Sequence, residues 1–197
     1  WIMVMLVNAE RSALEIRPTH RVLLDAGRDA LRTLVGGDDP LFQAVPVAPE
    51  ALSAALEARR DDETPLFGLV LPGDEGWLLI GDPDGLADRL RRERMSSAVR
   101  ALDLASLHVA LLADRLGISE ADVAAGTRLA YTRDEADARG RVARGEAAAA
   151  ILVRPTRLDQ MAAVAAAGDV MPQKSTYFYP KLLTGMVFNP VSDSRED

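Results

Sequence analysis

The residues with the clearest potential for chemistry lie in the segment MPQKSTYFYPK, at positions 171–181. The chain has 23 lysine and arginine residues, and only two of them, Lys174 and Lys181, are lysine. Lysine is a compact charge that binds phosphate as a point donor and can lose its proton when it is desolvated, whereas arginine stays charged. A chain that carries its other basic charges on arginine therefore favours a specific role for these two lysines.

The surroundings of the two lysines favour an anionic ligand. No acidic residue occurs between Asp169 and Asp193, although the chain has 30 acidic residues and a net charge of −7. Prolines near both ends of the segment restrict its backbone. We therefore expect a loop that binds a small anionic ligand, with Lys174 also a candidate catalytic residue. The alternative is a packed connection with its rings in the core and its lysines on the surface. The residues expected to bind the anion are Lys174, Ser175, Thr176, Tyr177 and Lys181.

A second candidate segment is RPTHR, at positions 17–21. It offers a hydroxyl at Thr19, a titratable imidazole at His20 and a fixed cation at Arg21, which we expect at the end of a strand. We predict His20 as a general base and Thr19 and Arg21 as anion-binding residues. The alternative is a hydrogen-bonded structural histidine. Because open sheets gather ligands at strand ends, we expect this segment and the Lys174 loop to face one cavity, with an anion, water or acidic side chain between them.

Composition excludes several classes of function. With 48% hydrophobic and 27% charged residues, the chain has the composition of a globular protein. A net charge of −7 disfavours binding to nucleic acid or to an anionic membrane, and the first apolar run, WIMVMLV, is too short to span a bilayer. The absence of cysteine excludes disulfides and thiolate chemistry and is consistent with the cytoplasm. With two distant histidines, no metal site is expected.

The order of apolar runs and helical patterns predicts an α/β or α+β fold, a mixed sheet with helices packed on it. We treat residues 1–197 as a single region, with a sub-boundary near residue 95 and a flexible tail at 192–197. The segment LFGLVLPGDEGWLLIG is typical of a β-hairpin, and S/T-x-x-D/E patterns at 119, 132 and 156 indicate helix starts. We expect strands at residues 2–8, 14–17, 66–71, 77–80, 127–131, 149–153 and 185–188, and helices at 49–60 and 97–116.

Several motifs in order resemble one conserved microbial family. They are LVNAE, ALEIRPTHRVL, LDLASLHVALLADRLGI, RLAYTRDEADA and MPQKSTYFYPKLLTGMVFNP. The family is known as domain of unknown function 1015, and the resemblance covers essentially the whole chain. Family members carry an Ala-Asp-Gly-His-His-Arg-Tyr segment ahead of this region, and this chain does not contain it. The resemblance therefore implies the C-terminal half of a longer protein.

The family segment that this chain lacks is similar to the Gly-x-His-Arg motif of ParB and sulfiredoxin folds. Those folds bind nucleotide phosphates, and some of their relatives phosphorylate free serine. The resemblance thus implies a small-molecule kinase or phosphotransferase that uses a nucleotide or pyrophosphate, with or without Mg²⁺, and needs the other half of the protein as well as this one. The alternative is a non-catalytic module that senses a ligand or binds a protein. The sequence leaves the phosphoryl donor, the acceptor and the oligomeric state open.

Overall fold

The structure is a computed structural model that describes residue 8 and residues 15–181. The strands expected at 2–8 and 185–188 and the tail at 192–197 lie outside these described residues, apart from Asn8, which is not in a strand. In the described part of the chain, no helix is long and apolar enough to cross a membrane.

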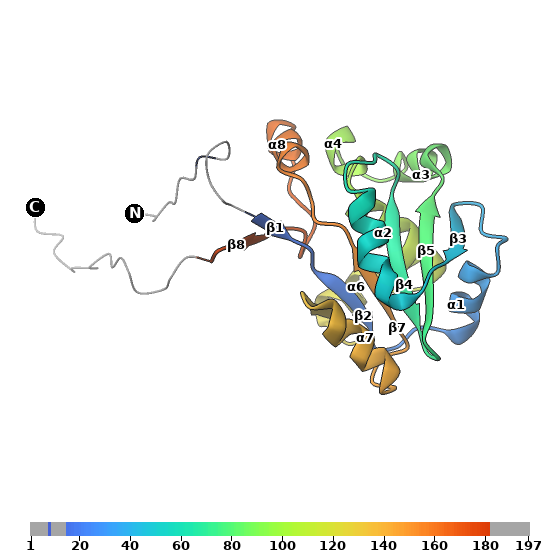
Figure 1. The fold of residues 1–197 in the computed structure, drawn as a ribbon. Helices are drawn as coiled ribbons and strands as arrows, with labels where there is room; N and C mark the ends of the chain where they lie inside the picture. Colours follow the sequence, from blue (N-terminus) through green and yellow to red (C-terminus); the bar gives the residue numbers. More distant parts are fainter. Residues whose placement is uncertain (1–7, 9–14, 182–197) are drawn as a thin grey trace, which may run out of the picture.

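A six-stranded sheet forms the centre of the fold (Figure 1), and its strands lie in the order β3-β5-β4-β7-β2-β6. Every neighbouring pair in this sheet is antiparallel. A separate two-stranded ribbon pairs β1 with β8 and extends away from the sheet. The strands are β1 (Glu15–Arg17), β2 (His20–Leu23), β3 (Phe42–Pro46), β4 (Leu66–Leu71), β5 (Glu75–Gly81), β6 (Leu129–Thr132), β7 (Ala149–Val153) and β8 (Tyr177–Tyr179).

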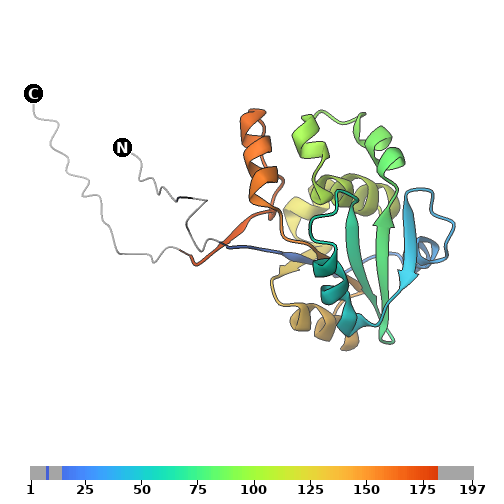
Figure 2. The same cartoon turned by 45° about the horizontal axis from the view of Figure 1, so that its top comes forward.

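Helices cover both faces of the sheet. One apolar cluster packs α2 and α7 on one face, and a larger cluster packs α1, α3, α5 and η2 on the other. A third cluster joins α3, α4, α5 and α8 at one end of the molecule, where the orange α8 and the green α3 and α4 lie in Figure 2. The helices are α1 (Arg28–Val35), the 3₁₀-helix η1 (Pro49–Ala51), α2 (Leu52–Ala58), α3 (Pro83–Leu90), α4 (Ser97–Arg100), α5 (Asp103–Ser106), the π-helix η2 (Leu107–Arg115), α6 (Glu120–Ala125), α7 (Glu135–Ala143) and α8 (Leu158–Ala166).

The two central strands explain the continuous apolar runs in the sequence. Every residue of β4 (LFGLVL) and of β7 (AAILV) is buried, because helices cover both faces of these strands. Burying a leucine or valine side chain contributes about 1.5–3 kcal/mol, so this region is the main source of hydrophobic stabilisation. The predicted α/β or α+β class is confirmed in its α+β form, and the sheet is antiparallel rather than mixed.

The sequence located the central elements well and the short ones poorly. β4, β7 and the β4–β5 hairpin agree with their predictions, and the Ser119-x-x-Asp122 pattern forms a capping box on α6. The other two patterns were wrong by one or two residues, since Asp134 caps α7 and Arg157 precedes α8. The helix expected at 97–116 is interrupted after α4 and continues as α5 and η2. Strands β2, β3 and β8 and helices α1 and α3 were not predicted.

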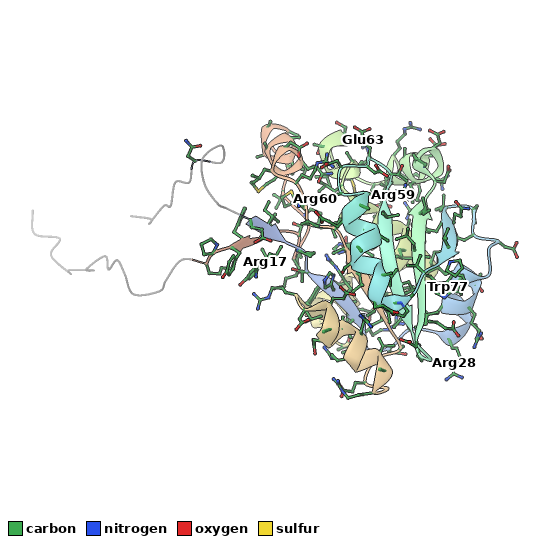
Figure 3. All side chains as sticks on the ribbon, viewed as in Figure 1. Arg17, Arg28, Arg59, Arg60, Glu63 and Trp77 are labelled. Carbon is green, nitrogen blue, oxygen red and sulfur yellow. The ribbon has the colours of Figure 1, made fainter. Side chains whose placement is uncertain are left out.

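A buried arginine connects the end of β7 to two other parts of the chain. Arg154 donates two hydrogen bonds to the carboxylate of Asp103, both 2.9 Å long. It also donates to the carbonyl oxygens of Arg59, which Figure 3 labels near the end of α2, and of Thr64. Burial raises the pKa of Asp103 to about 6, and the Arg154 guanidinium limits that rise. The pair therefore depends on Arg154 to keep a buried carboxylate ionised.

We expect Arg154→Ala to destabilise the fold strongly, because it leaves the Asp103 carboxylate and two carbonyl groups without their donor. Removing one partner of a buried pair costs about 3–5 kcal/mol, or about 6–20 °C of melting temperature for a domain of this size. Thermal unfolding measures the effect. Arg91 is the matched control, because it pairs with Asp88 on the surface with 67% and 69% of the two side chains exposed. Arg91→Ala should change the melting temperature by no more than about 2 °C. Equal effects of the two substitutions would contradict this assignment.

Candidate functional site

Some of the predicted site residues line one cavity of about 720 Å³ beside the β1–β8 ribbon. Thr19 and Lys174, more than 150 residues apart, both line it, so these two predicted positions do meet. Residues of β1, β6 and β8 and of the loops that follow β1 and β6 complete its wall, and Figure 3 labels Arg17 at the ribbon. The lining residues are Arg17, Thr19, Tyr131, Thr132, Arg133, Asp134, Lys174, Tyr177 and Tyr179.

All three tyrosines of the chain line this cavity, and each has a cation over its ring. The guanidinium carbon of Arg17 lies 3.7 Å from the centre of the Tyr179 ring, and that of Arg133 lies 4.1 Å from the centre of the Tyr177 ring. Lys181 places its ammonium nitrogen 4.3 Å from the Tyr177 ring centre. Each such contact contributes about 0.5–1 kcal/mol at an exposed site. The rings therefore hold the cations beside the cavity without neutralising their charge.

The charge of the cavity is positive. Arg17, Arg133 and Lys174 line it, and Asp134 is the one carboxylate among its lining residues. That carboxylate already accepts hydrogen bonds from the backbone N–H groups of Ala136 and Asp137 at the start of α7. Arg17 also pairs with a carboxylate outside the cavity wall, that of Glu15, at 3.3 Å. The expected acidic side chain is present beside the two segments, yet cations remain in excess.

Lys174 has a backbone conformation that is unusual for a residue with a side chain. Its φ angle is +58°, in the left-handed region that costs a residue other than glycine about 1 kcal/mol or more. Two hydrogen bonds anchor the loop around it: the Ser175 hydroxyl donates to the Pro172 carbonyl at 2.6 Å, and the Thr156 hydroxyl donates to the Ser175 carbonyl at 3.1 Å. The loop thus holds Lys174 at the cavity at some cost in stability.

The other residues predicted for this loop have different positions. Ser175 is buried, and its hydroxyl shapes the loop, so it does not face the cavity. Thr176 is half-buried and is not part of the cavity wall. Tyr177 lines the cavity directly, and Lys181 lies over the Tyr177 ring. The structure therefore brings together Thr19, Lys174, Tyr177 and Lys181, while their roles in binding stay predictions.

His20 is buried in β2 and does not line the cavity. Its Nδ1 accepts a hydrogen bond of 3.3 Å from the backbone N–H of Val153, so the ring carries its proton on Nε2. Burial and the neighbouring Arg21 charge lower the pKa of His20 to about 4, whereas Asp134 acts in the opposite direction. The ring is neutral at pH 7, but its lone pair is engaged. This geometry favours the alternative of a structural histidine, and the predicted role as general base stays untested.

Arg21 lies on the opposite face of β2 and is fully buried. One of its Nη groups donates to the carbonyl oxygen of Thr19, and its guanidinium carbon lies 5.6 Å from the centre of the Tyr131 ring. Burial lowers the pKa of Arg21 to about 10, so the group remains charged at pH 7. Among the described residues, neither its Nε nor its other Nη group has a partner. Arg21 therefore contacts two residues of the cavity wall, Thr19 and Tyr131, from the interior of the protein.

Sequence reasoning missed six residues of the cavity wall, which are Arg17, Tyr131, Thr132, Arg133, Asp134 and Tyr179. The segment YTRD at 131–134 contains four of them and begins at Tyr131, where a strand was expected to end. The register of β2 with β6, in which His20 lies opposite Thr132, places this segment beside Thr19. Polar residues directly after a strand were the available signal, but their partner strand could not be known from the sequence.

The described residues do not fit a protein-bound Mg²⁺ in this cavity. Magnesium prefers octahedral oxygen ligands with one or two carboxylates, and Asp134, the carboxylate of the cavity wall, is occupied as a helix cap. In the described part of the chain, no group of three His, Cys, Asp or Glu residues could hold a metal ion. Another cavity of about 540 Å³, beside α1 and β4, contains neither lysine nor tyrosine and none of the predicted residues.

Comparison with known proteins leaves the family open. No family model matches the chain, and no curated protein matches it. Among solved structures, the chain is similar to a free serine kinase mutant in complex with AMP, with 12% identity and a TM-score of 0.47. The similarity covers 88% of this chain and 57% of that one, so this chain matches little more than half of that kinase. At this level the similarity does not assign a function, and the resemblance to the family of unknown function stays an expectation.

The state of His20 predicts a pH-dependent stability. The unfolded chain protonates this histidine near pKa 6.5, whereas the folded chain protonates it only near pKa 4, so stability is lost as the pH falls through that window. Thermal unfolding at about pH 7.5 and about pH 4.5 measures this loss. Between these two pH values, the free energy of unfolding should fall by about 2–3 kcal/mol more in the parent than in His20→Asn. Asn keeps an acceptor for Val153 but does not titrate. The other buried groups that titrate in this range, such as His108 and Asp103, are present in both proteins. Equal losses would contradict the buried neutral histidine.

Proposed function

We propose that the chain binds a small molecule that carries a phosphate group in the cavity lined by Lys174, Arg17 and Arg133. The observation that supports this most directly is the excess of cations, held by tyrosine rings, around a cavity of small-molecule size in an acidic protein. A phosphate offers the charge and the acceptor oxygens that such a site prefers. Tyrosine rings can also pack against an apolar part of the same ligand.

The proposed reaction is phosphoryl transfer to a small hydroxylated metabolite such as free serine, as the family resemblance implies. The terminal phosphorus of the donor would form a bond to the hydroxyl oxygen of the acceptor, and its bond to the bridging oxygen would break, so that the rest of the donor leaves with that oxygen. The hydroxyl proton would pass to solvent or to a base outside the described residues. Lys174 and Arg133 would stabilise charge on the transferring group, which is most of what this chemistry requires. Thr19 would orient a phosphate oxygen.

A non-catalytic ligand-sensing module is the second candidate, and a specific observation favours it. Phosphoryl transfer to a hydroxyl group uses a residue that orients the hydroxyl and accepts its proton. Asp134 is engaged by two backbone N–H groups, and the lone pair of His20 is engaged by Val153. The described residues around the cavity therefore offer binding groups more readily than a base. A protein segment outside them would have to supply that base for catalysis.

Mass spectrometry separates the two candidates. The chain, and the longest natural form of the protein that contains it, would be incubated with ATP, ADP or pyrophosphate and a pool of hydroxylated metabolites that includes serine. We expect a metabolite that gains one phosphoryl group, and we expect Lys174→Ala to abolish it because the transition state loses a cation. Binding of the donor without any product would favour the sensing module. If the chain shows no binding of the donor and no product, both candidates are refuted.

The anion site predicts stabilisation by pyrophosphate at constant ionic strength. A ligand at a hundred times its dissociation constant adds about 2.7 kcal/mol, which corresponds to a rise of about 5–10 °C in melting temperature. Lys174→Gly should reduce affinity about 10–100-fold because a charge-assisted hydrogen bond is lost. Lys174→Arg should be nearly as deleterious if a compact charge is required. Isothermal titration and thermal unfolding measure these effects.

The conformation of Lys174 separates its function from its contribution to stability. At φ +58°, glycine is unstrained, whereas lysine and alanine carry the same strain, so Lys174→Gly should be at least as stable as the parent protein, by up to about 1 kcal/mol, and Lys174→Ala should be about as stable as the parent. Arg92→Ala is the matched control, because Arg92 is exposed and its loss changes the net charge equally. Two outcomes would contradict a specific anion site. In the first, Arg92→Ala weakens pyrophosphate binding as much as Lys174→Gly does, and in the second, chloride stabilises the chain as well as pyrophosphate does. Either would show that pyrophosphate acts only by general screening of charge.

A further inference from the structure

The two edge strands of the six-stranded sheet, β3 and β6, differ in how their outer backbone groups are used. Directly after β3, the N–H of Val47 donates to the carbonyl oxygen of Gly76 at 2.9 Å. Because the direction of these groups alternates along a strand, Phe42 and Pro46 direct theirs away from the sheet. The Asp39 carboxylate accepts the N–H of Phe42 at 3.1 Å, and Pro46 has no N–H. This edge is therefore protected against pairing with another strand.

The opposite edge strand, β6, does not have this protection. The N–H of Leu24 donates to the carbonyl oxygen of Arg128 at 2.9 Å, and the register of β2 with β6 continues from there without a break. By the same alternation, Leu129 and Tyr131 direct their N–H and C=O groups away from the sheet. Among the described residues, none of these four backbone groups has a hydrogen-bond partner. Three of the four residues of β6 are half-buried, so the open edge is accessible to a further strand.

The two ends of β6 differ in charge. Arg128, before the strand, pairs with Asp25 at 3.5 Å and with Asp122 at 3.8 Å. Arg133, directly after the strand, contacts a tyrosine ring and forms no ion pair within the described part of the chain. Both Tyr131 and Arg133 line the cationic cavity, so the open edge continues directly into that cavity. An acidic residue on an added strand would therefore meet an unneutralised cation at this end of β6.

The occupant of this edge has to satisfy both the backbone groups and the charge. A second copy of the chain, paired antiparallel through β6, would satisfy the backbone groups, but it would bring Arg133 beside the Arg128 end of the other strand. Like charges that lie opposite each other on paired strands repel. An extended segment that carries carboxylates satisfies both requirements, because its backbone pairs with β6 and its acidic side chains meet Arg133.

We propose that β6 is an interaction surface for an extended acidic segment of another protein, which adds to the edge of the sheet as a further strand. Every pair in this sheet is antiparallel, so the added strand runs antiparallel to β6. Its N-terminal end then lies at Arg133, and its acidic residues precede the residues that pair with Leu129 and Tyr131. Backbone hydrogen bonds supply the affinity, and the acidic residues supply the specificity. The proposal does not rest on phosphate binding, although the two ligands share Arg133.

Titration of the ¹⁵N-labelled chain with the peptide acetyl-Asp-Glu-Thr-Val-Thr-Val-amide, monitored by NMR, tests the proposal. We expect a dissociation constant on the order of 1 mM for a probe of this size. At ten times that concentration, exchange of the Leu129 and Tyr131 amide hydrogens with solvent should slow about tenfold, because only the free fraction exchanges. The amides of the protected edge strand β3 should not change and are the internal control. Arg133→Gln should weaken binding about fivefold to tenfold, whereas Arg92→Gln, with the same change of charge elsewhere, should leave it unchanged.

Three altered peptides distinguish strand addition from general attraction of charge. Methylation of the backbone nitrogens of the two threonines, or of the two valines, should abolish binding in one case and leave it unchanged in the other, because only alternate residues direct their N–H groups toward β6. Replacement of Asp-Glu by Asn-Gln should weaken binding about tenfold. The reversed peptide, acetyl-Val-Thr-Val-Thr-Glu-Asp-amide, has the same composition and should bind at least about threefold more weakly, because its acidic residues meet Arg133 only in a parallel pair.

The proposal is overturned if exchange at Leu129 and Tyr131 does not slow, if both methylated peptides bind alike, or if the Asn-Gln peptide binds as well as the acidic one. It is also overturned if these amides become protected as the chain concentration rises in the absence of peptide, together with a doubled mass, because a second copy then occupies the edge. Pyrophosphate binding, measured without peptide, decides the proposed function separately, so either result can hold when the other fails.

Discussion

The pairing of β7 with both β4 and β2 is the interaction on which the rest of the structure depends. β7 is buried along its whole length and joins the β3-β5-β4 half of the sheet to the β2-β6 half. One of its backbone N–H groups, that of Val153, donates to His20, and the next residue, Arg154, connects Asp103 with two backbone carbonyl groups near the end of α2. A shift of one residue in this pairing would exchange the two faces of the strand and separate every one of these contacts. The register of this pairing therefore fixes the relative positions of the residues in the candidate site.

The same sheet explains why two distant segments share one cavity. β2 lies between β7 and β6, so the residues before β2 and the residues after β6 meet at one end of the sheet. The β1–β8 ribbon then brings the last described part of the chain to this position. Cations from three segments would repel one another in the absence of an anion, and the tyrosine rings reduce that repulsion only in part. An anionic ligand would reduce this repulsion, which is the physical basis of the proposed function.

The loop around Lys174 has a further property, because it separates two cavities of different character. Pro172 and Gln173 face an apolar cavity beside His108, and Lys174 and Tyr177 face the cationic one. Arg21 lies between them: its side chain bonds to Thr19 on one side, and its charge lowers the pKa of His108 on the other. A buried guanidinium without a carboxylate partner among the described residues is costly for folding. Arg21 lines neither cavity, so its two unpartnered groups are a cost borne inside the fold.

The sequence alone determined the class of the fold, its central strands and the position of the basic loop. Continuous apolar runs predicted β4 and β7 because strands covered on both faces need no alternation, and the rarity of lysine drew attention to Lys174 and Lys181. Only the tertiary structure decided that the sheet is antiparallel, that Ser175 supports the loop from within, and that His20 and Arg21 lie on opposite faces of β2. It also decided that Arg17, Arg133 and the three tyrosines belong to the same cavity. These features depend on which strands pair and in which register, and such long-range contacts leave no mark in the local pattern of a single sequence.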